Sequence, residues 1–361
     1  MSTKDFSNID KLLLGEIYTS KEAWNNLLTL CDECGSRFMG TEEEIKARNF
    51  VRRSMKSSGL DNVHLESFDY LAWVRNPRGA NLKLLSPRET ELSTISLPYC
   101  PSTPRGGLVA NAVDAGDGTP EEFERLGKRA EGNMVMVTNR TPAYFGRRLH
   151  RKEKFGRILN AGASAFIYVN MSDGRLQETG ALCFNQEAPI PGVSISKEDY
   201  TWMQRLSAKG KLKMKLVTRD STHPAKGNNV VGELKGTSGS DEMIVVGAHY
   251  DGHDISVGAG DNANGAAVLL EIARVLALVR KHIKTTVRFI SFSAEEFGLI
   301  GARADVARHE EELDSIRLML NIDGIQPAMP KGLLFHRWNG MQLYVAKLAK
   351  DMGYPIPTGS R

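Results

Sequence analysis

The chain has 361 residues, 41% of them hydrophobic, which is enough for a substantial core and for two domains or one large domain with an insertion. Its 47 basic and 43 acidic residues are mixed, and no long basic block indicates a nucleic-acid partner. The apolar run Leu12 to Leu14 is too short for a signal peptide and no later run could span a bilayer, so we expect a cytoplasmic protein without a membrane partner.

The first ninety residues contain two predicted helices followed by two predicted strands. Residues 8–31 have a helical pattern, and a second helix over 41–58 begins with a T-x-x-E capping box. The stretches NVHLESFDYLAW and ANLKLL are predicted strands. Cys31 and Cys34 form a lone CxxC among only four cysteines, so we expect ordinary helical cysteines and no disulfide scaffold.

Residues 95–225 differ from the segments on both sides in composition and in the length of their apolar runs. Short β-rich runs (NMVMVT, ASAFIYVN, GVSIS and KLKMKLVT) are separated by loops rich in glycine, proline and charge, with one helix near 150–160. Both ends of the segment are rich in Pro, Gly, Ser and Thr, as domain boundaries often are. We therefore predict an inserted β-rich domain at 95–225 within a domain formed by 1–94 and 226–361.

After residue 228 the chain alternates between strands and helices. Continuously or nearly continuously apolar runs such as MIVVGA and VRFISF are typical of strands that are buried on both faces. This pattern predicts an α/β fold with a mixed, mostly parallel sheet flanked by helices. The predicted strands are 228–234, 242–249, 286–293, 317–323 and 332–337, and the predicted helices are 264–281, 298–309 and 340–352.

Polar side chains follow three of these strands at the point where each strand ends. His249 and Asp251 follow the first, Glu295 and Glu296 the second, and Asp323 the third. Open α/β sheets bind ligands beyond the carboxyl ends of their strands, so these side chains should meet in one crevice. A further candidate is Asp261, in the glycine-rich turn GAGDNANGAA that leads into the helix at 264–281.

One imidazole among several carboxylates is a ligand set for a catalytic divalent metal rather than for a thiolate-rich structural site. Cations would neutralise the crowded carboxylates, and the two adjacent glutamates would then have separate roles, Glu296 as a ligand and Glu295 as general base. Each motif alone also fits a structural reading: a solvated first helical turn, an N-cap, a lone histidine or a turn aspartate. Their coincidence at one sheet edge favours the metal site.

These motifs resemble the M28 family of dizinc peptidases. The family pattern H-x-D, G-x-x-D-(D/N)-x-x-G, E-E-x-G-L-x-G and N-x-D is matched at 249–251, 258–265, 295–301 and 321–323. Residues 34–50, CGSRFMGTEEEIKARNF, also resemble the N-terminal segment of the family. The insert resembles a protease-associated (PA) domain through GNMVMVTN, NAGASAFIYVN and PIPGVSISKED in that order.

The resemblance implies a zinc-exopeptidase-like fold and two Zn²⁺ ions, with cobalt or manganese as alternatives. His249 and Asp323 would bind one zinc, Glu296 would bind the other, and Asp261 would bridge them.

The resemblance also implies the catalytic groups and the substrate. Glu295 would be the general base, and Asp251 would orient the ring of His249. The substrate would be a peptide, most simply one shortened from its N-terminus by an aminopeptidase, with the PA-like insert limiting access to the cleft.

One departure from the family pattern concerns its fifth ligand, a histidine near the C-terminus, where this chain ends in PIPTGSR. His253 and His336 are weak substitutes. We therefore expect this chain to have reduced zinc occupancy and to be weakly active or inactive. A carboxypeptidase, a one-metal glutaminyl cyclase and a non-catalytic binding protein on the same scaffold remain alternatives, and a second copy of the chain remains a candidate partner.

Overall fold

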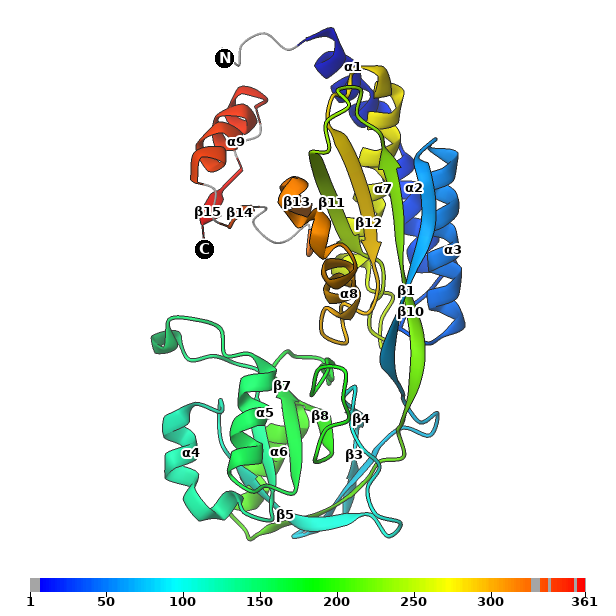
Figure 1. Ribbon diagram of the computed structural model, residues 1–361. Helices are drawn as coiled ribbons and strands as arrows, with labels where there is room; N and C mark the ends of the chain where they lie inside the picture. Colours follow the sequence, from blue (N-terminus) through cyan, green and yellow to red (C-terminus); the bar gives the residue numbers. More distant parts are fainter. Residues whose placement is uncertain (1–6, 326–331, 337–338, 354–355, 361) are drawn as a thin grey trace. The chain divides into compact units, whose positions relative to one another are not determined.

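The computed structural model describes residues 7–325, 332–336, 339–353 and 356–360, and the chain forms two compact units (Figure 1). The first unit comprises Met1–Phe68, Gly227–Glu295 and Gly301–Arg361. The second comprises Asp69–Lys226 together with the short segment Glu296–Ile300.

A five-stranded sheet forms the centre of the first unit, in the order β1-β10-β12-β11-β13. β11 pairs in parallel with both β12 and β13, whereas β10 pairs antiparallel with β12, so the sheet is mixed as the sequence predicts. The strands are β1 (Asp61–Val74), β10 (Ser221–Leu234), β11 (Met243–His249), β12 (Thr286–Phe292) and β13 (Ile316–Asn321).

Helices cover both faces of this sheet. Successive side chains of a strand point to opposite faces, so an apolar strand presents apolar side chains to the helices on each side. Val246 and Phe289 face a core that includes α3 (Glu42–Ser57) and α7 (Asn264–Leu278), whereas their neighbours Val245 and Ile290 face α8 (Ile300–Arg308) (Figure 1). Burial on both sides is the physical reason for the apolar runs in β11 and β12.

The N-terminal helix expected over 8–31 is interrupted in the structure. It consists of α1 (Asn8–Thr19), α2 (Glu22–Leu28) and a π-helical turn, Thr29–Glu33. Ser20 leaves the helical conformation with φ −70° and ψ 146°, and its hydroxyl accepts the N–H of Glu22 at 3.0 Å. A serine that bonds the backbone locally in this way competes with helix continuation.

The capping box predicted at the start of α3 forms only in part. The Thr41 hydroxyl accepts the N–H of Glu44 at 3.3 Å, as an N-cap should. The Glu44 carboxylate instead accepts the hydroxyl of the fully buried Tyr250 at 2.6 Å. A tertiary contact therefore replaces the local one, and burial raises the pKa of Glu44 against the lowering effect of this hydrogen bond.

The second unit contains an eight-stranded sheet in the order β3-β2-β9-β5-β6-β7-β8-β4. β5 to β8 pair in parallel, and antiparallel pairs extend the sheet on both sides. The strands are β2 (Asn81–Ser86), β3 (Thr90–Leu92), β4 (Thr94–Ser96), β5 (Leu108–Asp114), β6 (Met134–Thr138), β7 (Ala165–Asn170), β8 (Gly192–Ser196) and β9 (Leu212–Val217).

The limits and helices of this unit differ from the sequence-based expectation. The unit begins at Asp69 rather than at residue 95, because β2 pairs with β9 and so belongs to its sheet. Besides α5 (Arg151–Asn160), which the sequence predicts, the unit contains α4 (Pro120–Leu126) and α6 (Lys197–Ser207). α4 begins with a complete capping box and a proline in its first turn, a signal that was readable in T-P-E-E.

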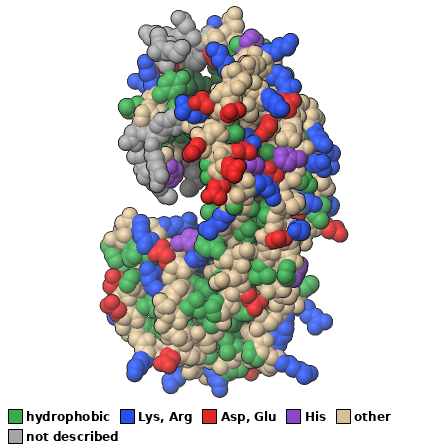
Figure 2. Space-filling view, viewed as in Figure 1, with side chains coloured by type: hydrophobic (Ala, Val, Ile, Leu, Met, Phe, Trp, Pro, Cys, Tyr) green, Lys and Arg blue, Asp and Glu red, His purple; other side chains and the backbone are tan. Residues whose placement is uncertain are grey.

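The last described elements are β14 (Leu333–Phe335), α9 (Asn339–Asp351) and β15 (Thr358–Ser360), with β14 and β15 paired in parallel. Among the helices that the structure describes, none combines the length and apolar composition that a bilayer crossing needs. Charges of both signs are mixed over the face seen in Figure 2.

A buried lysine in the second unit generates a testable pH dependence. Lys154 is fully buried and donates to the carbonyls of Thr138 at 2.8 Å and Arg140 at 2.5 Å. Burial lowers its pKa from 10.5 to about 8, against the attraction of nearby carboxylates. Between these two values the unfolded chain binds more protons than the folded one, so stability rises with pH in that window.

We expect the free energy of unfolding of the second unit to rise by about 2 kcal/mol more in the wild type than in Lys154→Met between pH 8 and 10.5. Chemical denaturation at a series of pH values measures this difference. The exposed Lys211, changed to Met, is the matched control and should follow the wild type. Parallel curves for the wild type and Lys154→Met would contradict the prediction.

Candidate metal centre

The carboxyl ends of three strands meet at one edge of the five-stranded sheet. His249, the last residue of β11, stands level with Phe292 of β12, and Gly247 stands level with Asn321 of β13. Because these pairings are parallel, the residues that follow the strands emerge at the same edge. The structure thus brings His249, Asp261 and Asp323 together, with Asp251 beside the imidazole ring.

His249 is buried, with 3% of its side chain exposed, and its two ring nitrogens have different partners. Nδ1 lies 3.1 Å from the main-chain oxygen of Asp251 and 3.6 Å from its carboxylate. Nε2 lies 3.1 Å from Oδ1 of Asp261 and 3.6 Å from Oδ1 of Asp323. Ligand atoms of His249, Asp261 and Asp323 all lie within 4.8 Å of one another.

This donor set fits a bound cation. A carbonyl oxygen only accepts hydrogen bonds, so Nδ1–H is the donor to Asp251, and the neutral ring directs its Nε2 lone pair at two carboxylates. Such an arrangement is repulsive unless a metal or a proton lies there. Burial lowers the pKa of His249, but hydrogen bonds with the three aspartates outweigh it and raise that pKa well above its usual value.

Asp261 reaches His249 because the turn that carries it is not helical. Within the turn Ala259–Ala263, Asp261 and Asn262 have φ near −136° and −135°, outside the helical range, and the peptide bond between them is cis. The Asn262 amide donates to the carbonyl of Ile322 at 2.9 Å, which ties the turn to the segment that carries Asp323. A Cβ at Gly265 would lie 2.5 Å from that carbonyl, so this close approach requires glycine there.

Asp251, on the Nδ1 side of the His249 ring, is fully buried. Its Oδ1 accepts the main-chain N–H of Glu295 at 3.2 Å and lies 3.6 Å from Nδ1 of His249. One carboxylate therefore contacts both the candidate ligand and the backbone of the candidate base. Ala294 has a positive φ of 55°, so the chain bends sharply between β12 and Glu295.

Glu296 belongs to the second unit, as part of the segment Glu296–Ile300. There its negative charge opposes the lowering of the pKa of Arg151 that burial causes. Its predicted role as a ligand stays a prediction. Of the two substitute histidines, His253 contributes to the lowered pKa of Asp261, after the larger effect of the hydrogen bond from His249, and His336 is exposed.

Sequence reasoning missed the role of Arg37, which is fully buried. Its guanidinium donates to five main-chain carbonyls, and three of them lie in the loop between Asp251 and Asp261 or just before it. These acceptors are the carbonyls of Tyr250 (2.8 Å), Val257 (2.6 Å), Gly258 (3.0 Å), Gly35 (2.6 Å) and Leu30 (3.2 Å). Arg37 stands within the quoted CGSR segment, but nothing in that string indicates which carbonyls it would contact.

The nearby CxxC does not add ligands to this centre. Cys31 and Cys34 are buried free thiols. Burial raises the pKa of both thiols, which keeps them protonated and unreactive. They lie in and directly after a π-helical turn, and Cys31 packs in the core beside α3 and α7, as expected for structural cysteines.

Two family models match the chain. Residues 229–359 match the model of Peptidase family M28, and residues 104–203 match the PA domain. The first match covers all of the residues gathered around His249.

Similar proteins include an aminopeptidase and a carboxypeptidase. The chain is 29% identical over 335 residues to aminopeptidase YwaD of Bacillus subtilis (strain 168), covering 91% of this chain and 67% of YwaD. It is 26% identical over 318 residues to carboxypeptidase Q of Bos taurus, covering 87% of this chain and 66% of that protein. The chain thus spans about two thirds of the length of these relatives.

The fold is also similar to that of a solved zinc aminopeptidase of Bacillus subtilis, BSAP. The TM-score is 0.71 at 26% sequence identity, and the match covers 94% of this chain and 78% of BSAP.

The carbonyls that surround the Arg37 guanidinium indicate what replacing this arginine would do. We expect Arg37→Met to lower the free energy of unfolding of the metal-free first unit by about 2–4 kcal/mol, since buried carbonyls lose charged donors. Zinc affinity should fall as well, because the loop that carries Asp251 and Asp261 is released. Denaturant unfolding and zinc titration measure the two effects.

Arg37→Lys should recover only part of the loss, because an ammonium lacks the planar fork of donors. The exposed Arg53, changed to Met, is the matched control. Equal effects of Arg37→Met and Arg53→Met would show that these carbonyl contacts do not hold the loop.

Proposed function

Because the chain belongs to peptidase family M28 and carries an inserted PA domain, we propose that it is a zinc-dependent exopeptidase that shortens peptides from the N-terminus. The observation that carries the proposal is the buried imidazole of His249, whose Nε2 faces two carboxylates at the edge of the sheet. The named relatives, an aminopeptidase and a carboxypeptidase, support exopeptidase chemistry.

Zinc would be held by His249, Asp261 and Asp323, with Glu296 completing a second zinc position and Asp261 shared between the two. Cobalt and manganese suit the same ligands. When bound, zinc supplies Lewis-acid polarisation of the scissile carbonyl and lowers the pKa of the attacking water. The side chains of Asp261 and Asp323 are 60% and 42% exposed, which suits a site that must admit a substrate.

The chain's own groups would move the proton. Glu295 is partly buried, directly after the bend at Ala294, and in this role it takes a proton from the attacking water and returns it to the leaving amine. Asp251 acts as a positioning residue, since its carboxylate contacts both the Glu295 N–H and the His249 ring.

The charge around the site favours recognition of an N-terminal ammonium over a C-terminal carboxylate. Asp251, Asp261 and Asp323 lie around one imidazole in the first unit, so negative side chains are in excess there before a metal binds. Arg37 donates to five main-chain carbonyls, so its guanidinium is not available to a substrate carboxylate. Carboxypeptidase activity is the second candidate, favoured by the similarity to carboxypeptidase Q.

Substrates with one blocked end separate the two candidates. We expect an amino-acid anilide with a free ammonium to be hydrolysed about 100-fold faster than its N-acetyl form, because the neutral amide leaves the carboxylate that would pair with the ammonium without a partner. A chelator should abolish the activity, and Zn²⁺ or Co²⁺ should restore it. Faster release of the last residue from an N-acetylated dipeptide would establish the carboxypeptidase instead.

Replacement of the general base gives a separate test. We expect Glu295→Gln to lower kcat by about 10²–10⁴-fold while the bound zinc per chain stays unchanged, because the amide cannot accept the proton. The exposed Glu311, changed to Gln, is the control and should retain the wild-type rate. Unchanged turnover in Glu295→Gln would exclude this base.

If no metal-dependent turnover is found in any of these assays, the non-catalytic binding protein becomes the better reading. The same zinc analysis measures how many zinc ions each chain binds. Comparison of dipeptides with longer peptides tests the proposed role of the PA domain in limiting substrate size.

A further inference from the structure

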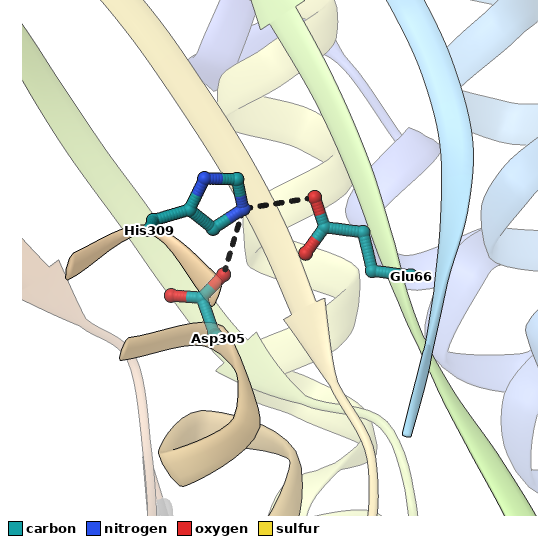
Figure 3. Close-up of side chains that lie close together, drawn as sticks. All are labelled: Glu66, Asp305 and His309. Carbon is teal, nitrogen blue, oxygen red and sulfur yellow. Dashed lines mark hydrogen bonds and ion pairs between the residues drawn. The ribbon is translucent and has the colours of Figure 1, made fainter. Parts of the chain in front are cut away.

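A second group of metal-type ligands lies in the first unit, where the end of α8 meets β1. Glu66 of β1, Asp305 of α8 and His309, which follows α8 directly, offer ligand atoms that all lie within 4.8 Å of one another (Figure 3). We propose that this cluster binds a divalent transition metal of the Zn²⁺ type, which fastens α8 to β1. The proposal is independent of the peptidase activity.

The three side chains converge on a common point and are largely buried. Nε2 of His309 lies 2.9 Å from Oε1 of Glu66 and 4.0 Å from Oδ1 of Asp305 (Figure 3). The side chains are 5% (Glu66), 16% (Asp305) and 16% (His309) exposed. Ligand atoms around a tetrahedral zinc at 2.0–2.2 Å stand about 3.4 Å apart, so the observed separations lie on either side of that value.

The orientation of His309 matches that of a metal ligand. Its other ring nitrogen, Nδ1, lies 3.3 Å from Oε1 of Glu312, and Arg288 holds the second oxygen of Glu312 at 2.7 Å. Metal-binding histidines commonly donate the opposite N–H to a carboxylate in this manner. With Nδ1–H so used, the lone pair of the neutral ring at Nε2 faces Glu66 and Asp305.

A second imidazole points at the same carboxylate. Nδ1 of His64 lies 2.7 Å from the carbonyl of Asn62, so its N–H is the donor there, and Nε2 lies 3.1 Å from Oε1 of Glu66. Two imidazoles therefore direct Nε2 at one oxygen, Oε1. Because Nδ1–H of His64 already serves a carbonyl, its Nε2 contact with Oε1 needs either a further proton on that ring or a cation between the two atoms.

Asp305 distinguishes these two sources of charge. A proton on Nε2 of His309 can serve Glu66 at 2.9 Å but does not reach Asp305 at 4.0 Å. Oδ1 of Asp305 is buried and has no hydrogen-bond donor among the described residues. A cation between the three ligand atoms satisfies all of them, whereas protons on the imidazoles leave this oxygen unsatisfied.

The cationic neighbours of the cluster leave the ligand atoms accessible to an ion. Arg308 forms an ion pair with Oε2 of Glu66 at 3.2 Å, whereas both imidazoles contact the other oxygen, Oε1. Arg288 pairs with Glu233 and Glu312 rather than with the three ligands. The enclosed, two-element character of the cluster is that of a structural metal site.

Zinc binding by a full-length chain without the first site tests the proposal. In a background with His249→Ala and Asp323→Asn, we expect about one Zn²⁺ per chain in competition with a chromophoric chelator. In that background His309→Gln should weaken binding at least 100-fold, and Glu312→Gln by about 10–100-fold. The exposed His282, changed to Gln, is the matched control and should leave the affinity unchanged.

Thermal unfolding separates loss of a ligand from loss of the fold. Zn²⁺ should raise the Tm of the background variant until one equivalent is bound, and should not raise it after His309→Gln. With chelator present, the Tm of Glu312→Gln should match the background, so its weaker binding would report the site even if His309→Gln is destabilised. No retained zinc in the background, or a Tm that responds only to pH, would overturn the proposal in favour of two protonated imidazoles.

Discussion

Carboxylates gathered around a buried imidazole are the constraint on which the rest of the first unit depends. Asp261 and Asp323 approach Nε2 of His249 at 3.1 and 3.6 Å, and like charges at such separations repel unless a cation lies between them. The parallel pairing of β11 with β13 brings His249 and the segment of Asp323 to one edge, and the non-helical turn Ala259–Ala263 adds Asp261. The gathering of these side chains is thus a consequence of sheet topology as well as of residue type.

Neutral and cationic contacts to the main chain hold this crowded edge in place. Arg37 donates to carbonyls just before and within the Asp251–Asp261 loop, and Asn262 ties the following turn to the carbonyl of Ile322. Neither residue needs to touch a substrate. Their hydrogen bonds position the ligands through the backbone, which is how a scaffold keeps a site close to its productive geometry.

The first unit repeats one arrangement at two places with different exposure. In both, a main-chain or carboxylate oxygen engages Nδ1 of a histidine and Nε2 faces two carboxylates, at His249 and at His309. The ligands around His249 are up to 60% exposed, whereas those around His309 are at most 16% exposed. An open site suits catalysis and a closed one suits a structural ion, so burial rather than ligand type separates the two roles.

Sequence alone determined the α/β class, the inserted β-rich domain and the set of polar residues beyond three strands, because apolar periodicity and strand-end position are local properties. It did not determine the start of the second unit at Asp69, the break at Ser20 or the π-helical turn that follows α2. The carbonyl contacts of Arg37 and the cluster of Glu66 with His309 were equally hidden, because their members are up to 243 positions apart in the chain. Only tertiary structure brings such groups within hydrogen-bond distance, since pairing across a sheet depends on how the whole chain packs.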